Sequence, residues 1–132
     1  MFLGSYKTSF DRKTRRVALP KKIREEIYTS EIILSYGFDH CVFGFDTKSW
    51  KKESEKQLDA PITDRSARNI RRFFFSSAIL VRFDNQGRFV IPSDLQIWAH
   101  ISHPIIVGAG DHFEIWEEKL WEEQRRRIEE KL

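Results

Sequence analysis

A short segment of this chain occurs twice, and the repeat restricts the possible fold more than any other feature. The first copy reads FDRKTRRVALP over residues 10–20, and the second reads FDNQGRFVIP over residues 83–92. Each copy has an aspartate, a turn-like stretch ending in arginine, a β-prone run and a proline. An apolar residue, Ile23 or Leu95, follows three positions after the proline. The duplication predicts two equivalent hairpin modules in one small chain.

The repeat extends beyond these segments, with one irregularity. A shift of 72 positions aligns Arg16 with Arg88 and Pro20 with Pro92 inside the segments, and Asp39 with Asp111 and His40 with His112 beyond them. The aspartates Asp11 and Asp84 need a shift of 73, so the first copy has one extra residue, which predicts a longer turn or a bulge. Counting forward from Asp11 makes Arg15 the counterpart of Arg88, whereas counting back from the proline makes Arg16 the counterpart.

Length and composition indicate one folded domain. A chain of 132 residues with 40% apolar and 14% aromatic residues suits a single compact unit. The only cysteine, Cys41, cannot form an intrachain disulfide, which is typical of a reducing compartment. No apolar run is long enough to span a bilayer, and the first residues lack the pattern of a signal peptide. These features predict a cytoplasmic protein.

The order of periodic segments predicts an α+β fold built from two tandem β modules. The expected parts are a first module at 5–47, connecting helices at 48–75, a second module at 76–119 and a C-terminal helix at 120–132. Pro20 is expected to start a short helix over Lys21–Tyr28. Thr47 and Thr63 are expected to cap the two connecting helices.

Positive charge is concentrated in the first half of the chain. Residues 1–72 contain 16 Lys and Arg against 10 Asp and Glu, whereas residues 73–132 contain 7 against 10. Such asymmetry favours an acidic partner, with nucleic acid first, although a solvated charged face is the commoner explanation of charge runs. A second basic group, formed by Arg65, Arg68, Arg71 and Arg72, is expected to pair with glutamates of the C-terminal helix, namely Glu122, Glu123, Glu129 and Glu130.

Each repeated segment contains an Asp/Arg pair, Asp11/Arg15 and Asp84/Arg88, that has two explanations. The aspartate can accept backbone N–H groups in the turn, and the arginine can staple the hairpin, a contact worth about 0–1 kcal/mol when exposed. The alternative is nucleic-acid binding, which needs several converging cations. Only the first copy has that density, so the candidate contacts are Lys7, Arg12, Lys13, Arg15, Arg16 and Lys21.

Catalysis finds little support in the sequence. His40 and His112 recur at equivalent turn positions, which duplication explains without acid–base chemistry. His100 and His103 lack further ligands at metal-binding spacing, and Cys41 lies in an apolar run typical of a core strand. There is no phosphate-binding glycine loop or nucleophile elbow. We therefore expect no enzyme activity, no metal or other cofactor and no small-molecule substrate.

With these segments in place, the chain resembles the MraZ family, whose modules belong to the AbrB-like, SpoVT-type swapped-hairpin class. The resemblance covers nearly the whole length. It depends on Met1-Phe2-Leu3-Gly4, the two Asp-x-x-x-Arg segments, Phe73-Phe74-Phe75-Ser76, Val107-Gly108, Phe113-Glu114-Ile115-Trp116 and Trp121. It implies two swapped-hairpin modules in a pseudo-twofold arrangement, with peripheral helices.

The resemblance also implies a function. Family members look like ring-shaped homo-oligomers that regulate transcription of their own division and cell-wall operon. Here this implies a nucleoid-associated regulator, expected to repress transcription. It would bind double-stranded DNA through a first-module arginine, Arg15 or Arg16. Turns that point the same way around a ring would read direct repeats about 10–10.5 bp apart.

Two other functions stay open. One is a structural or protein-interaction ring whose basic face binds an acidic protein. The other, weaker, is an antitoxin-like AbrB module. Such proteins usually have one hairpin module and a flexible tail, whereas this chain uses its second half for a second module.

Overall fold

Nine strands form two antiparallel sheets in a computed structural model that describes the whole chain, residues 1–132. The larger sheet contains, in spatial order, β1 (Ser5–Lys7), β8 (Pro104–Gly108), β9 (Phe113–Glu117), β5 (Val42–Phe45), β4 (Glu31–Tyr36) and β6 (Ile79–Arg82). The smaller sheet contains β2 (Phe10–Asp11), β3 (Arg16–Ala18) and β7 (Arg88–Val90), in that order.

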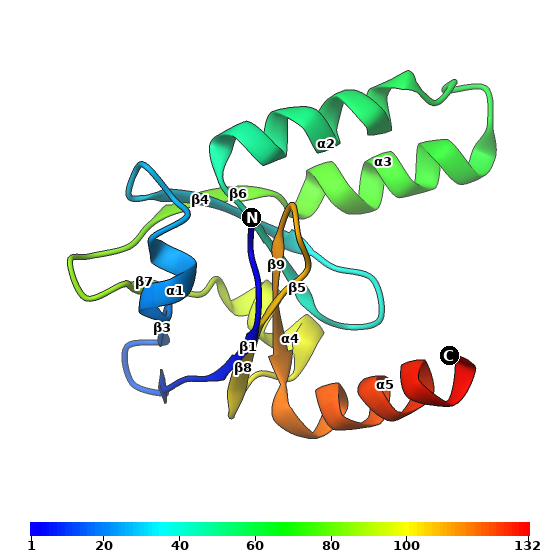
Figure 1. Cartoon of the computed structure of the whole chain (residues 1–132). Coiled ribbons are helices and arrows are strands. Elements are labelled where there is room, and N and C mark those ends of the chain that lie inside the picture. Colours follow the sequence, from blue (N-terminus) through cyan, green and yellow to red (C-terminus); the bar gives the residue numbers. More distant parts are fainter.

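Five helices surround the sheets. They are α1 (Lys21–Arg24), α2 (Thr47–Asp59), α3 (Arg65–Ser77), α4 (Ser93–Ala99) and α5 (Glu118–Lys131). In Figure 1 the α2–α3 hairpin projects at one end of the larger sheet and α5 projects at the other, while the turns of the smaller sheet lie on the opposite side of the molecule. No helix is both long enough and apolar enough to cross a membrane.

The two modules exchange strands around a pseudo-twofold axis. In the β3–β7 pair, Val17 lies opposite Phe89 and Arg16 opposite Val90, and the shift of 72 positions maps this register onto itself. The edge strand β1 of the first half pairs with β8 of the second, and β6 of the second half pairs with β4 of the first. The predicted α+β fold with two swapped β modules is confirmed.

The core lies where the repeated segments meet. Val17 and Phe89, central in their strands, are 0% and 1% exposed. The apolar residues that follow the two prolines, Ile23 and Leu95, are both fully buried as well. Burial of side chains of this size contributes about 1.5–3 kcal/mol each, so the repeated pattern encodes the centre of the core twice.

The predicted helix starts need correction. Asp46 caps α2, because its carboxylate accepts the N–H of Ser49 at 2.7 Å. Asp64 caps α3 in the same way, accepting the N–H of Ala67 at 2.9 Å. The predictions of Thr47 and Thr63 as caps were therefore wrong by one residue, because in each case an adjacent aspartate offers a charged acceptor to the free N–H groups of the first turn.

The first short helix is also shorter than predicted. It ends at Arg24 rather than Tyr28, and Tyr28 is fully exposed. Ile23 and Ile27 are both buried, so the apolar spacing that suggested a longer helix is satisfied by a helical turn and the bend that follows it.

The arginines of α3 do not pair with the C-terminal helix. Arg71 donates to the carbonyl groups of Leu58 and Ala60, both at 2.7 Å, and Arg68 donates to Ile62 O at 2.8 Å. The expected pairing with the α5 glutamates was wrong, because α3 and α5 lie at opposite ends of the larger sheet (Figure 1). These arginines instead satisfy carbonyl groups at the end of α2 and in the loop that follows.

The phenylalanines of α3 are used within the chain. Phe73 packs against Tyr36 and Trp98, with ring centroids 5.1 and 5.3 Å apart, and Phe74 packs against Trp50 at 4.9 Å. These contacts join α3 to both modules of one subunit.

Candidate nucleic-acid interface

The turn of the first repeated segment is built around Asp11. Its carboxylate accepts the backbone N–H groups of Lys13 at 2.9 Å and Thr14 at 3.3 Å. Arg15 then adopts a left-handed backbone conformation with φ of +57°, and Arg16 begins β3 directly opposite Asp11. An aspartate at the start of a turn commonly acts in this way, and it leaves the arginine side chains outside the hydrogen-bonded loop.

The second turn shows which arginines correspond. Gly87 has the left-handed conformation there, with φ of +79°, and Asp84 N donates to Arg88 O across the hairpin. Arg15 therefore stands at the position of Gly87, and Arg16 at the position of Arg88. The extra residue of the first copy lies within its turn, in the stretch from Arg12 to Arg15.

The two Asp/Arg pairs differ in their contacts. In the second copy, Arg88 Nε donates to Asp84 Oδ2 at 2.9 Å. The pKa of Asp84 is lowered, chiefly by the hydrogen bond from the Arg88 backbone N–H. In the first copy, neither Arg15 nor Arg16 forms an ion pair or a side-chain hydrogen bond with Asp11. The second pair staples its hairpin, whereas the first leaves two guanidinium groups free.

Four of the six predicted contact residues, Arg12, Lys13, Arg15 and Arg16, lie in the first turn or begin the strand after it, and five of the six are free. Lys21 lies at the start of α1, whose Arg24 donates to Asn85 O of the second turn. The side chains of Arg12, Lys13, Arg15, Arg16 and Lys21 are exposed and form no ion pair within the chain. Lys7 is the exception: its ammonium group lies 2.9 Å from Glu118 Oε1 of α5, and the hydrogen bond to that carboxylate raises the pKa of Lys7. The free cations make the first turn suited to a polyanion.

A shallow concavity lies beside this turn on the smaller sheet. Its volume is about 540 Å³, and its lining consists of Ser9, Phe10, Asp11, Thr14, Arg16, Ala18 and Arg88. Arginines from both modules therefore share one surface. Asp11 is the only carboxylate in the lining, and its Oδ1 atom already accepts two backbone N–H groups.

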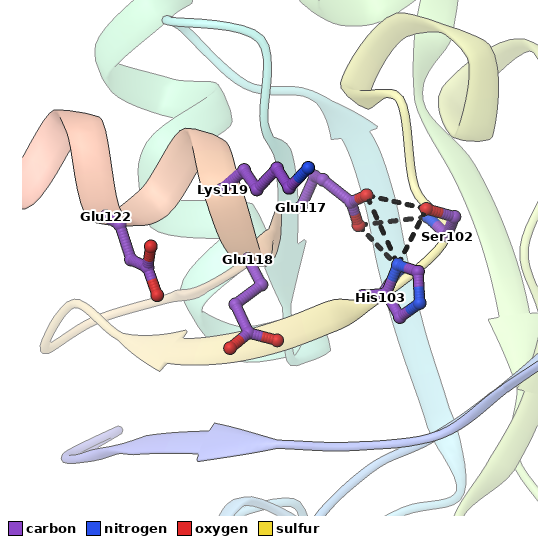
Figure 2. Close-up of a pocket in the computed structure, with 6 residues that line it drawn as sticks. All are labelled: Ser102, His103, Glu117, Glu118, Lys119 and Glu122. Atoms are coloured by element: carbon purple, nitrogen blue, oxygen red, sulfur yellow. Dashed lines mark hydrogen bonds and ion pairs between the residues drawn. The ribbon is translucent and has the colours of Figure 1, made fainter.

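A second polar cluster, at the start of α5, has a structural explanation (Figure 2). Glu117 Oε2 accepts the hydroxyl of Ser102 at 2.6 Å, and Oε1 accepts the backbone N–H groups of Ser102 and His103. Burial raises the pKa of Glu117, but these hydrogen bonds outweigh it and the net shift is downward. A Ser, a His and a Glu meet here. However, the hydroxyl donates to the carboxylate, and a single ring nitrogen, His103 Nδ1, lies 3.1 Å from Ser102 Oγ and 3.8 Å from Glu117 Oε2. In a catalytic triad the serine and the carboxylate face the two different ring nitrogens, so this cluster joins β8 to β9 and is not arranged as a triad.

The repeated histidines have different partners. His112 lies between Asp111 Oδ1 at 2.7 Å and Glu114 Oε2 at 2.9 Å, whereas His40 stacks on Trp98 at 4.1 Å. Burial lowers the pKa of His112, but the hydrogen bonds to the two carboxylates outweigh it and raise the pKa. The repeat predicted that both histidines lie in turns. It did not predict that two carboxylates flank His112, because Glu114 lies on the following strand.

The predicted core position of Cys41 is confirmed. Its thiol is buried, and burial raises its pKa far above the ordinary value. A thiol that stays protonated in an apolar environment is a poor nucleophile.

Comparison with known proteins assigns the family. The family described as "MraZ protein, putative antitoxin-like" matches the chain twice, over residues 1–73 and 74–132. Three similar proteins each bear the name "Transcriptional regulator MraZ". The protein from Halothermothrix orenii is 38% identical over 92% of this chain and 84% of its own length. The protein from Caldicellulosiruptor saccharolyticus is 40% identical over 100% and 90%, and that from Clostridium tetani is 39% identical over 93% and 86%. Together with the two swapped β modules, these matches show that the chain belongs to the MraZ family.

Proposed function

We propose that this protein is a transcriptional regulator that binds specific double-stranded DNA through the turn of its first module. The observation that carries the proposal is the set of unpaired cations there, Arg12, Lys13, Arg15 and Arg16, on a hairpin whose counterpart in the second module is neutralised by its own ion pair. The names of the relatives support a role in transcription.

Two kinds of DNA contact follow from the positions of these residues. Arg12 and Lys13 in the turn and Lys21 at the start of α1 are exposed and lie outside the lining of the concavity. They suit phosphate groups, which position a protein without reading sequence. Arg16 lies on the strand itself, beside the concavity, and its planar guanidinium group suits the O6 and N7 acceptors of guanine in the major groove. The proposed site thus combines affinity and specificity.

The regulatory part of the proposal rests on family membership. We infer a repressor of the protein's own division and cell-wall operon, acting in the cytoplasm at the nucleoid. One subunit offers a single free basic turn, a small footprint for discriminating one site in a genome. A ring-like homo-oligomer would present several such turns in the same direction, so we expect direct repeats near one helical turn apart, about 10–10.5 bp.

The test is binding to the DNA upstream of the protein's own gene. Fluorescence anisotropy should show specific binding by the wild-type protein and loss of binding by the double variant Arg15→Ala/Arg16→Ala, with unchanged thermal unfolding. The matched control is Arg65→Ala/Arg72→Ala, which removes two exposed arginines from α3 and should bind like the wild type. Binding that is insensitive to salt, or lost equally in both double variants, would contradict the proposal and favour an acidic protein partner for the basic face.

A further inference from the structure

The outward face of the β3–β7 pair combines residues of both modules. Side chains alternate along a strand, so Val17 and Phe89 point into the core while their neighbours point outward. The register places Arg16 opposite Val90 and Ala18 opposite Arg88. Opposite residues on one face of an antiparallel pair have Cβ atoms about 4.5–5.5 Å apart. Arg16 of the first module and Val90 of the second are therefore neighbours on an exposed surface.

Val90 is unusual among the residues of the β3–β7 strand pair. It is 41% exposed, although it is a β-branched apolar residue in the smaller sheet, and its pseudo-symmetric counterpart Ala18 is smaller and half-buried. Its neighbours along the chain, Phe89 and Ile91, are 1% and 0% exposed. Val90 thus presents an uncovered apolar group next to the free guanidinium of Arg16.

At the other end of the β3–β7 face, the arginine is paired. Arg88 is held by Asp84 at 2.9 Å, and its cross-strand neighbour is Ala18. The pseudo-twofold face therefore has one end with a free arginine beside an exposed valine, and another with a paired arginine beside an alanine. Only the first end offers both a polar donor and an apolar contact to a ligand.

We propose that Arg16 and Val90 form one reading unit in the major groove, in which Arg16 bonds to guanine and Val90 contacts the C5-methyl group of a neighbouring thymine. The major groove admits a two-stranded β-ribbon, and apolar contact with the thymine methyl is an established means of distinguishing thymine there. The inference rests on the proposed function and goes beyond it, because it assigns the second module a role in sequence reading through an uncharged residue.

The experiment separates the methyl contact from DNA binding in general. A duplex is selected from a randomised pool with the wild-type protein, and each thymine is replaced in turn by deoxyuridine, which removes only the methyl group. For the wild type, replacement at one position should weaken binding about fourfold, the effect of one methyl group removed from contact. Val90→Ala should bind the selected duplex about fourfold more weakly and should be insensitive to replacement at that position.

A matched control is Leu80→Ala, which truncates an exposed apolar residue on β6, outside the smaller sheet. It should keep both the wild-type affinity and the response to deoxyuridine. If the response persists unchanged in Val90→Ala, or if no thymine matters, the reading unit is wrong while specific binding stands. If Arg16→Ala binds the selected duplex like the wild type, or if no duplex is enriched, the proposed function fails and this inference fails with it.

Discussion

The two turns of the repeat occupy equivalent places in the fold but have different chemistry. The second turn has Gly87 at its left-handed position and closes with the Arg88–Asp84 ion pair. The first is one residue longer, has Arg15 at the left-handed position and leaves its arginines unpaired. Duplication thus provided two copies of one hairpin, of which the second pairs its arginine with its aspartate and the first leaves its arginines unpaired.

The largest expected difference is in DNA affinity after removal of the equivalent arginines. Arg16→Ala should cost about 1–3 kcal/mol of binding, the range for a lost contact to a base, with little change in stability. Arg88→Ala should cost less binding. It should lower the free energy of unfolding only slightly, because the pair is exposed. Anisotropy titrations and urea unfolding at equal protein concentration measure both quantities.

The opposite pattern would show that the comparison is mistaken. An equal loss of affinity in the two variants would mean that both modules contact DNA through these arginines. The salt dependence of binding adds a check, because log affinity should fall with log salt at a slope near −0.9 for each phosphate contact. Removal of Lys13 should make this slope less steep, whereas removal of Arg88 should leave it unchanged.

A smaller effect is expected at the left-handed position of each turn. Gly87→Ala should destabilise the protein by about 1–2 kcal/mol or more, since a left-handed residue with a Cβ is strained. The added Cβ would also lie 2.7 Å from Leu19 O. Arg15→Gly relieves that strain but increases the freedom of the unfolded chain, so its net change in stability should stay below about 1 kcal/mol.

Urea unfolding of the two variants measures this contrast. Equal destabilisation by Gly87→Ala and Arg15→Gly would show that Arg15 and Gly87 are not in equivalent positions. In DNA titrations, Arg15→Gly should bind more weakly than the wild type because it lacks one cation, whereas the affinity of Gly87→Ala should change little while it remains folded.

Local patterns predicted most of the fold. The repeat, the prolines and the apolar spacing correctly indicated an α+β fold with two β modules, because these patterns depend on neighbours in the sequence. Strand exchange between the halves was predicted only in general terms, through the family resemblance, and the pairing of β1 with β8 and of β6 with β4 was not predicted. Cross-strand pairing of distant segments has no signal in local periodicity.

The contacts of the candidate site were less predictable for the same reason. The cluster of cations was visible in the sequence, but which ones are free depends on distant partners: Glu118 holds Lys7, and Asp84 holds Arg88. The placement of Val90 beside Arg16 depends on the register of two strands far apart in the chain. Residue type suggested the chemistry, and only the assembled sheet showed which groups are available.

The smallest expected effect concerns the repeated histidines, which extend the comparison from the turns to the larger sheet. His112 lies between the carboxylates of Asp111 and Glu114, and its ring stacks on Phe45 across the junction of the modules. The pKa of its partner Asp111 is lowered, chiefly by the hydrogen bond to His112 and to a smaller extent by the positive charge of Lys56. Two carboxylates facing both ring nitrogens favour the charged imidazolium, which has two donors.

The direction of the pH dependence follows from the raised pKa of His112. Stabilisation is fully present below the unfolded value of 6.5 and is lost as the pH rises through the higher folded value. The free energy of unfolding of the wild type should therefore fall above pH 6.5, and His112→Gln should flatten this part of the curve. The control is His40→Gln, at the equivalent position but stacked on Trp98, which should keep the wild-type slope. If His40→Gln flattened the curve equally, the carboxylate clamp would not be its cause, and the two copies would be alike in this respect.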